Sequence, residues 1–190
     1  SRSGERGIFN RQACKDMAPE RRDTDHEFGT NPCSEIVLRS AQFCNLTEVV
    51  VRPEDNLDML KVKVEAATIL GTLQSALTDF RFLRKVWKNN CEEERLLGVS
   101  LTGLWDRLDP LTEDDLCQLR THAINVNADY SKRLKINPAT AITCVKPSGT
   151  VSQLVNSASG CHPRHSKFYI RRVRNDIKDP LAKVMIDAGI

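Results

Sequence analysis

Residues 96–101 read LLGVSL, a nearly continuous apolar run that lies between Arg95 and the pair Thr102-Gly103. A strand with one exposed face alternates apolar and polar residues, whereas a strand buried on both faces is apolar throughout. The run therefore predicts a strand in the interior of a sheet. Such strands belong to parallel sheets that are covered by helices.

Patterns typical of helices and strands alternate on both sides of this run. Between Pro53 and about Phe80, apolar residues recur every three or four positions, which predicts a long helix. Thr112 can cap a second helix that extends to about Leu134. Shorter strands are predicted over 34–38, 45–51 and 140–145, and shorter helices over 10–17, 151–156 and 183–190. The alternation predicts an α/β fold with parallel strands, in one partial domain over residues 1–190.

The composition favours an ordinary water-soluble protein. The 190 residues are 40% hydrophobic and 28% charged, which suits one domain with a core and excludes a disordered chain or a membrane protein. The net charge of +3 is spread along the chain, so there is no basic footprint of a dedicated nucleic-acid binder. The chain begins without methionine and stops inside the helical pattern at 183–190, and we therefore expect a fragment of a larger protein.

The cysteines indicate a reducing environment. There are seven, with no CxxC pair and no secretory signal, which predicts a cytoplasmic location. Cys161 lies near two histidines, but adjacent residues do not easily reach one ion and a fourth ligand is lacking, so no metal site is predicted. Three cysteines within or beside apolar segments are predicted to belong to the core: Cys91, Cys117 and Cys144.

The first stretch with candidate chemistry covers residues 27–45, EFGTNPCSEIVLRSAQFCN. In an extended backbone, Asn31, Cys33 and Glu35 point to the same face. A carboxylate beside a thiol raises the cysteine pKa, which disfavours a thiolate nucleophile but suits a neutral thiol or a thiyl radical. Glu35 can then move a proton on the substrate while Asn31 holds its hydroxyl groups. The spacing alone is equally consistent with an Asn-Pro turn that carries a buried cysteine.

The second stretch is KPSGTVS, residues 146–152, which follows the predicted strand over 140–145. A turn between a strand and a helix offers free backbone N–H groups and hydroxyls, and the helix dipole places its positive end there, so the motif suits a phosphate. It lacks the order of residues found in a Walker loop. Taken alone, a Ser or Thr before a helix is more often a plain N-cap than an anion site.

Both stretches resemble segments of one known family. NPCSEI (31–36) and FCNLT (43–47) resemble the finger loop of ribonucleotide reductases, specifically the adenosylcobalamin-dependent class and its monomeric triphosphate reductases. KPSGTVS resembles the turn that holds the substrate phosphates in these enzymes. The resemblance implies part of the family's ten-stranded α/β barrel, with the finger loop at about 27–45 in its interior. Four further blocks resemble the family in the same order: GERGIFN (4–10), LGVSLTG (97–103), GCHP (160–163) and YIRRVR (169–174).

The resemblance also implies a role for individual residues. Cys33 becomes a thiyl radical that removes the 3′-hydrogen of the ribose, while Asn31 and Glu35 bind and deprotonate ribose hydroxyls. Cys44 is one half of a dithiol that supplies two electrons, and its partner lies upstream of this chain. Family members commonly carry glycine at the position of Ser34. The resemblance also implies that the turn binds the substrate phosphates, and Lys146 is assigned to this role less firmly than its neighbours. The residues assigned to the phosphates are Ser148, Gly149, Thr150, Val151 and Ser152.

Cofactor, partners and alternatives follow from the same resemblance. The cofactor is adenosylcobalamin, and the reaction is the reduction of ribonucleotides, triphosphates in particular, to 2′-deoxyribonucleotides. A thioredoxin-like reductant, a nucleotide effector and a monomeric state are further expectations, and the isolated fragment is expected to be inactive. Two alternatives stay open: the large subunit of a class I diphosphate reductase, which uses a metal subunit, and a nucleotide-binding paralogue without chemistry.

Overall fold

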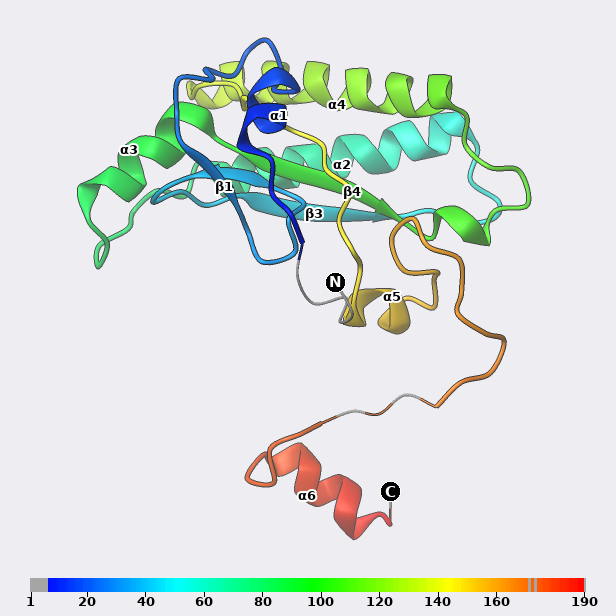
Figure 1. Cartoon of the computed structure of the whole chain (residues 1–190). Coiled ribbons are helices and arrows are strands. Elements are labelled where there is room, and N and C mark those ends of the chain that lie inside the picture. Colours follow the sequence, from blue (N-terminus) through cyan, green and yellow to red (C-terminus); the bar gives the residue numbers. More distant parts are fainter. Residues whose placement is uncertain (1–6, 171, 173, 190) are drawn as a thin grey trace.

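The computed structural model describes residues 7–170, 172 and 174–189, so residues 4–6, 171 and 173 of the family-like blocks lie outside the described part. Figure 1 shows the chain. Its helices and strands occur in this order: α1 (Arg11–Asp16), β1 (Phe28–Thr30), β2 (Val37–Arg39), β3 (Asn45–Val50), α2 (Leu57–Ser75), α3 (Lys85–Glu94), β4 (Leu97–Thr102), the 3₁₀ turn η1 (Leu104–Asp106), α4 (Glu113–Leu134), α5 (Thr150–Leu154) and α6 (Pro180–Asp187).

A parallel pair of strands forms the centre of the fold. β3 and β4 run in register from Asn45 opposite Leu97 to Val50 opposite Thr102, which confirms the predicted parallel arrangement of both strands. The third predicted strand, over 140–145, meets β4 at one bridge between Thr143 and Val99.

The register explains why that third segment is not a regular strand. Leu97 N donates to Ala141 O and Val99 N to Ile142 O, so two residues of β4 advance against one residue of the neighbouring segment. A regular parallel ladder advances both chains equally, and the mismatch interrupts it after one bridge.

Two long helices cover one face of this pair (Figure 1). α4 begins and ends as predicted, because Thr112 and Asp115 form a reciprocal capping box at its start. α2 begins after its cap Asn56 but ends at Ser75, earlier than the predicted Phe80, where the chain tightens into three-residue turns. α3 was not predicted, because its sequence KVWKNNCEEE carries few apolar residues to set a period.

The hydrophobic core lies between these helices and the strands. Gly71 of α2 allows the close approach, since a Cβ atom there would be 2.7 Å from Leu97 Cδ2. On the strand side, the core residues of β3 and β4 occupy alternate positions, as the side-chain period of a strand requires. The buried core consists of Val49, Val51, Leu60, Val64, Leu97, Val99, Leu119, Ala123, Ala139 and Ile142.

An antiparallel hairpin packs on the opposite face of the strands. β1 and β2 pair from Phe28 opposite Arg39 to Thr30 opposite Val37. Gly98 of β4 makes room for the hairpin, because a Cβ atom there would lie 2.9 Å from Ile36 Cδ1 and closer still to Leu46. The sheet is therefore covered by helices on one face and by the hairpin on the other.

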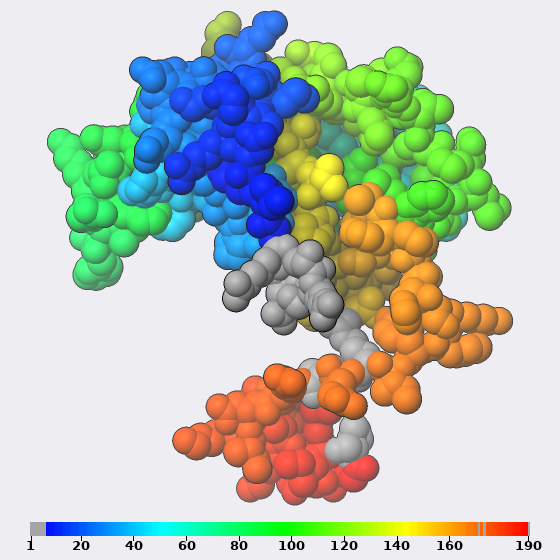
Figure 2. Space-filling view, viewed as in Figure 1, coloured from blue at the N-terminus to red at the C-terminus, as the bar shows by residue number. Residues whose placement is uncertain are grey.

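The C-terminal part lies away from this body in Figures 1 and 2. α6 corresponds to the helix predicted over 183–190 but begins earlier, at Pro180, with Asp179 as its cap; residue 190 lies outside the described residues. Among the three predicted core cysteines, Cys91 is buried and Cys144 is half-buried, whereas Cys117 is exposed on α4. Within the described ranges, no helix has both the length and the apolarity needed to cross a membrane.

Candidate active site

The segment over Asn31–Glu35 is a turn, not an extended strand. Asn31 O accepts a hydrogen bond from Ser34 N at 3.0 Å, and Asn31 Oδ1 accepts one from Ile36 N at 3.1 Å. Pro32 thus follows the first residue of the turn, where its fixed φ is favourable. The predicted same-face alternation of Asn31, Cys33 and Glu35 is therefore wrong, as is a strand that starts at residue 34. The Asn-Pro turn is present, but Cys33 is exposed on it and not buried.

Ser34 takes the strained position of this turn. Its φ of 64° lies in the left-handed region, which glycine adopts at no steric cost and other residues rarely adopt. A glycine at this position would relieve the strain. The turn separates the side chains of its two ends, so that Cys33 is exposed while Glu35 is directed toward the sheet.

Glu35 is enclosed and paired with a residue far along the chain. Its side chain is 1% exposed, and Lys146 Nζ donates to Glu35 Oε1 at 3.1 Å. Burial alone would raise the pKa of Glu35, but hydrogen bonds from its own backbone N–H, Asn31 and Lys146, together with the charge of Lys146, lower it. The second oxygen, Oε2, is buried and has no hydrogen-bond partner among the described residues. The carboxylate is thus ionised and has one oxygen unused.

Two thiols share these surroundings. Burial raises the pKa of Cys44, and the charge of Glu35 raises it further. The same two causes, with Cys44 as a third, raise the pKa of Cys144 to about 12. Both residues therefore carry protonated thiols at neutral pH. Cys144 was predicted as core only, and its Sγ in fact faces Gly98, Leu46 and Ile36 beneath the hairpin.

The turn over 146–152 is held by its own hydroxyl groups. Ser148 is buried and donates to Glu48 Oε1 of β3 at 2.8 Å, and Ser152 donates to Gly149 O at 2.7 Å. Two of the five predicted phosphate ligands therefore use their hydroxyls inside the protein. Gly149 is open, because a Cβ atom there would have no neighbour within 4 Å, and Val151 is half exposed. Thr150 begins the short helix α5.

A cavity of about 500 Å³ borders Glu35 between α1 and residues 141–143. This volume is in the range of small-molecule sites. Arg21 and Arg120 also line it. Figure 2 shows the yellow surface of the chain near residue 145 between the blue N-terminal residues and the orange residues that follow α5. A carboxylate, a nearby ammonium group and this space together can bind a polar ligand of nucleotide size.

Comparisons with known proteins give consistent relatives, although no family model matches. An adenosylcobalamin-dependent ribonucleoside-triphosphate reductase of Lactobacillus leichmannii is 30% identical over 192 residues, with 85% of this chain and 25% of the relative covered. A probable enzyme of the same name in Dictyostelium discoideum is 30% identical over 200 residues, with 98% of this chain and 26% of the relative covered. A crystal structure of a B-12 dependent (class II) ribonucleotide reductase aligns with a TM-score of 0.56 at 26% identity, with 78% of this chain and 23% of that chain covered.

The chain is a relative of the class II ribonucleotide reductases. It spans about a quarter of the length of the curated relatives it matches. The family resemblance of the chain is thereby confirmed, and the α/β class agrees with the structural neighbour.

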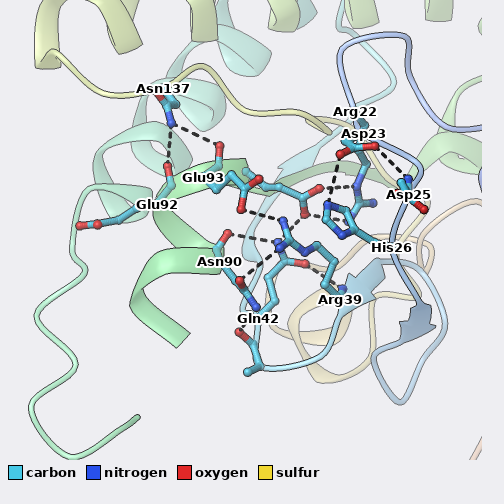
Figure 3. A network of polar contacts seen from close by, with 12 residues as sticks. Arg22, Asp23, Asp25, His26, Arg39, Gln42, Asn90, Glu92, Glu93 and Asn137 are labelled. Carbon is cyan, nitrogen blue, oxygen red and sulfur yellow. Dashed lines mark hydrogen bonds and ion pairs between the residues drawn. The ribbon is translucent and has the colours of Figure 1, made fainter. Parts of the chain in front are cut away.

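A polar network that no sequence motif predicted connects the hairpin of this chain to the rest of the fold (Figure 3). Arg22 donates through Nε and Nη2 to the two carboxylate oxygens of Glu94, each at 3.0 Å, and through Nη1 to Val37 O of β2 at 2.9 Å. Gln42 also donates to Glu94, and Arg22 lies over the ring of Phe28 in β1. Both charged side chains are almost fully buried, at 4% and 3% exposure.

The sequence pattern around Arg22 and Glu94 does not predict this network. Arg22 lies in an irregular segment and Glu94 ends a run of three acids, and both positions are typical of solvated charge. A weaker signal existed for Glu48, an acid beside two valines in the partly buried strand β3, where a polar partner is favourable. Lys146 was assigned less firmly than its neighbours, yet it makes the contact that joins the two motifs.

Proposed function

We propose that this chain forms part of the catalytic region of an enzyme that reduces ribonucleotides, ribonucleoside triphosphates in particular, to 2′-deoxyribonucleotides for DNA synthesis. The contact between Glu35 and Lys146 carries the proposal, because it joins the cysteine turn to the KPSGTVS turn across 111 residues of sequence. The names of the relatives support the same reaction and the triphosphate as substrate.

Three residues of the hairpin turn are proposed to act on different atoms of the ribose. Cys33, exposed at the turn, is the thiol whose radical removes the 3′-hydrogen. Glu35 is ionised and one of its oxygens has no hydrogen-bond partner within the described part of the chain, so it can accept a proton from a ribose hydroxyl. Asn31 has an amide that can bind the other hydroxyl, although its Oδ1 also holds Ile36 N.

Cys44 is the residue of this chain that supplies reducing equivalents. Its raised pKa keeps it as a thiol, which can give up a hydrogen atom where a thiolate would act as a nucleophile. Its oxidation to a disulfide requires a second thiol, which we place in the upstream part of the enzyme. A thioredoxin-like protein then reduces that disulfide, and a nucleotide effector and a monomeric enzyme complete the proposal.

Adenosylcobalamin is the proposed cofactor, and the position of Cys33 fits it. When bound, it supplies a radical through homolysis of its cobalt–carbon bond. A thiol that receives such a radical must be reachable from outside its own segment, and Cys33 is exposed while the neighbouring Glu35 is buried. The chain's own part is to hold the thiol at a rigid turn and to keep the carboxylate beside it.

The sheet is proposed to form part of the ten-stranded α/β barrel, with the hairpin as the finger loop over residues 27–45. The helices cover one face of β3 and β4 and the hairpin covers the other, as expected for the outside and the inside of such a barrel (Figure 1). The turn over 146–152 is proposed to receive the phosphates through Gly149, Thr150, Val151 and Lys146, while Ser148 and Ser152 brace it.

Replacement of Cys33 by serine in the full-length enzyme tests the proposed reaction. Serine keeps the size and polarity of the side chain but cannot form a thiyl radical under these conditions. We expect no deoxynucleotide product with adenosylcobalamin and a dithiol reductant. Cys117→Ser is the matched control, because this thiol is also exposed but lies on α4.

Two results would contradict the proposal. Deoxynucleotide formation by the Cys33→Ser enzyme would remove the radical role of this residue. Turnover by the wild-type enzyme that requires a metal subunit and is independent of adenosylcobalamin would place the protein with the other reductase class.

A further inference from the structure

The ion pair between Lys146 and Glu35 ties together two groups that the proposed reaction needs elsewhere. The carboxylate is needed at a ribose hydroxyl, and the ammonium group lies two residues before Ser148, at the start of the turn proposed for the phosphates. In the structure each satisfies the other, with Nζ 3.1 Å from Oε1. The pair therefore describes a resting arrangement in which neither group is committed to a nucleotide.

The two partners differ in their freedom to move. The Glu35 side chain is 1% exposed and is held at the end of a tight turn, whereas the Lys146 side chain is 28% exposed on a long flexible stem. If the pair opens, the lysine is the partner that leaves. The buried carboxylate would stay in place without its charge partner.

The groups around Glu35 determine how strongly its pKa depends on the charge of Lys146. The titratable groups that act on the pair are three thiols, those of Cys33, Cys44 and Cys144, and each is neutral when protonated. Three arginines also line the cavity beside Glu35, namely Arg21, Arg22 and Arg120. Arg21 donates to Ala139 O and Arg22 to Glu94, so these two already have partners. Hydrogen bonds from the Glu35 backbone N–H and from Asn31 remain when Lys146 leaves, but they bring no charge. Among the groups that lower the pKa of Glu35, after its backbone N–H and the Asn31 side chain, Lys146 is the one that carries a charge.

We propose that Lys146 exchanges partners when a nucleotide binds: it leaves the Glu35 carboxylate for a phosphate oxygen of the substrate, and phosphate docking thereby frees the carboxylate for the ribose. The inference rests on the proposed function for its ligand. A triphosphate carries more charge than one carboxylate, and Lys binds phosphate as a mobile point charge. The released carboxylate is a stronger base, because burial is then opposed by fewer favourable interactions.

Such an exchange links two events that must occur together. In the resting enzyme the paired Glu35 is a weak base, so the site is not set for proton removal when it is empty. A bound nucleotide converts it into a stronger base at the moment when a ribose hydroxyl is present. A nucleoside that lacks phosphate is expected to leave the pair closed.

Infrared titration of the Glu35 carboxyl group in the full-length enzyme tests the exchange without turnover. The Cys33→Ser background prevents the reaction, and subtraction of the Cys33→Ser, Glu35→Gln spectrum assigns the band. We expect the pKa of Glu35 to rise by about one unit or more with cytidine triphosphate. Inorganic triphosphate is expected to produce much of this rise, and cytidine none.

Two lysine variants separate the exchange from a static ion pair. With Lys146→Met, the pKa of Glu35 should be high without any ligand, and cytidine triphosphate should add little. Lys61→Met removes a partly exposed lysine on α2, and Glu35 should titrate in this variant as it does in the parent. An unchanged Glu35 titration at saturating cytidine triphosphate in the parent would show that the pair stays closed and would overturn the inference.

The pH dependence of turnover gives a second readout that a purely structural lysine would not produce. The acidic limb of kcat/KM reports the free enzyme, and that of kcat reports the complex. Because Lys146 lowers the pKa of Glu35 only in the free enzyme, Lys146→Met should move the kcat/KM limb to higher pH and leave the kcat limb in place. Equal shifts of both limbs would mean that the pair persists in the complex. If Cys33→Ser disproves the reductase, the infrared result still decides the exchange.

Discussion

The two faces of the β3–β4 pair differ in polarity although the same two strands form both. On the helical face, alternate positions carry Val49, Leu97 and Val99, which pack into the core beneath α2 and α4. On the hairpin face, the intervening positions carry Glu48 and Ser100, and Glu48 holds Ser148 of the turn. Because successive side chains of a strand point to opposite faces, six residues of each strand serve a hydrophobic core and a polar site at once.

The hairpin face is held to the sheet by a different set of contacts from those of the helical face. The hairpin buries the apolar side chains of Phe28 and Ile36. It also relies on two pairs of opposite charge: Arg22 and Glu94, which are both buried, and the buried Glu35 with the partly exposed Lys146. Such pairs stabilise a fold only while both members are present. The two faces should therefore respond differently to substitution.

The largest effect on stability is expected for Glu94→Gln. This change leaves the buried Arg22 guanidinium without its charge partner, and breaking a buried pair in this way costs about 3–5 kcal/mol. Urea denaturation should show the loss in the free energy of unfolding. Glu93→Gln is the control, because Glu93 pairs with Arg39 at the surface and is 57% exposed, so it should cost about 1 kcal/mol or less. Equal losses for the two variants would mean that the network does not anchor the hairpin.

A comparable but smaller loss is expected on the helical face for Leu97→Ala. Leu97 is 1% exposed in the core, and Leu→Ala changes in such positions cost about 2–5 kcal/mol through lost transfer energy and the cavity left behind. Leu108→Ala makes the same chemical change at a fully exposed position and should stay within about 0.5 kcal/mol. Similar unfolding curves for both variants would contradict the assigned core.

The smallest of these effects is expected where the hairpin meets the sheet. Gly98→Ala forces a methyl group against Ile36 and Leu46, and overpacking of this kind costs about 1–3 kcal/mol. Because Ile36 follows Glu35, the same change should also lower turnover of the full-length enzyme by displacing the turn. Gly29→Ala meets no atom within 4 Å and should leave both quantities nearly unchanged. Full activity of Gly98→Ala would show that the hairpin tolerates a shift.

Local patterns predicted the regular elements well and the irregular ones poorly. LLGVSL became β4, and the cap at Thr112 set the start of α4, because neighbours in sequence determine both features. The extended reading of residues 31–35 failed because hydrogen bonds between Asn31, Ser34 and Ile36 outweighed the alternation of side chains. Cys117 was predicted as core from its apolar neighbours but lies on the solvent side of α4.

The sequence by itself determined the strand–helix order, the family resemblance and the residue types of the site, because these depend on local propensity and on motifs of a few residues. Only the tertiary structure decided which charges meet. Lys146 reaches Glu35 across 111 residues and Arg22 reaches Glu94 across 72. The position of a buried ion pair depends on how β-strands and turns are packed against one another, and the spacing of two distant residues carries no information about that packing.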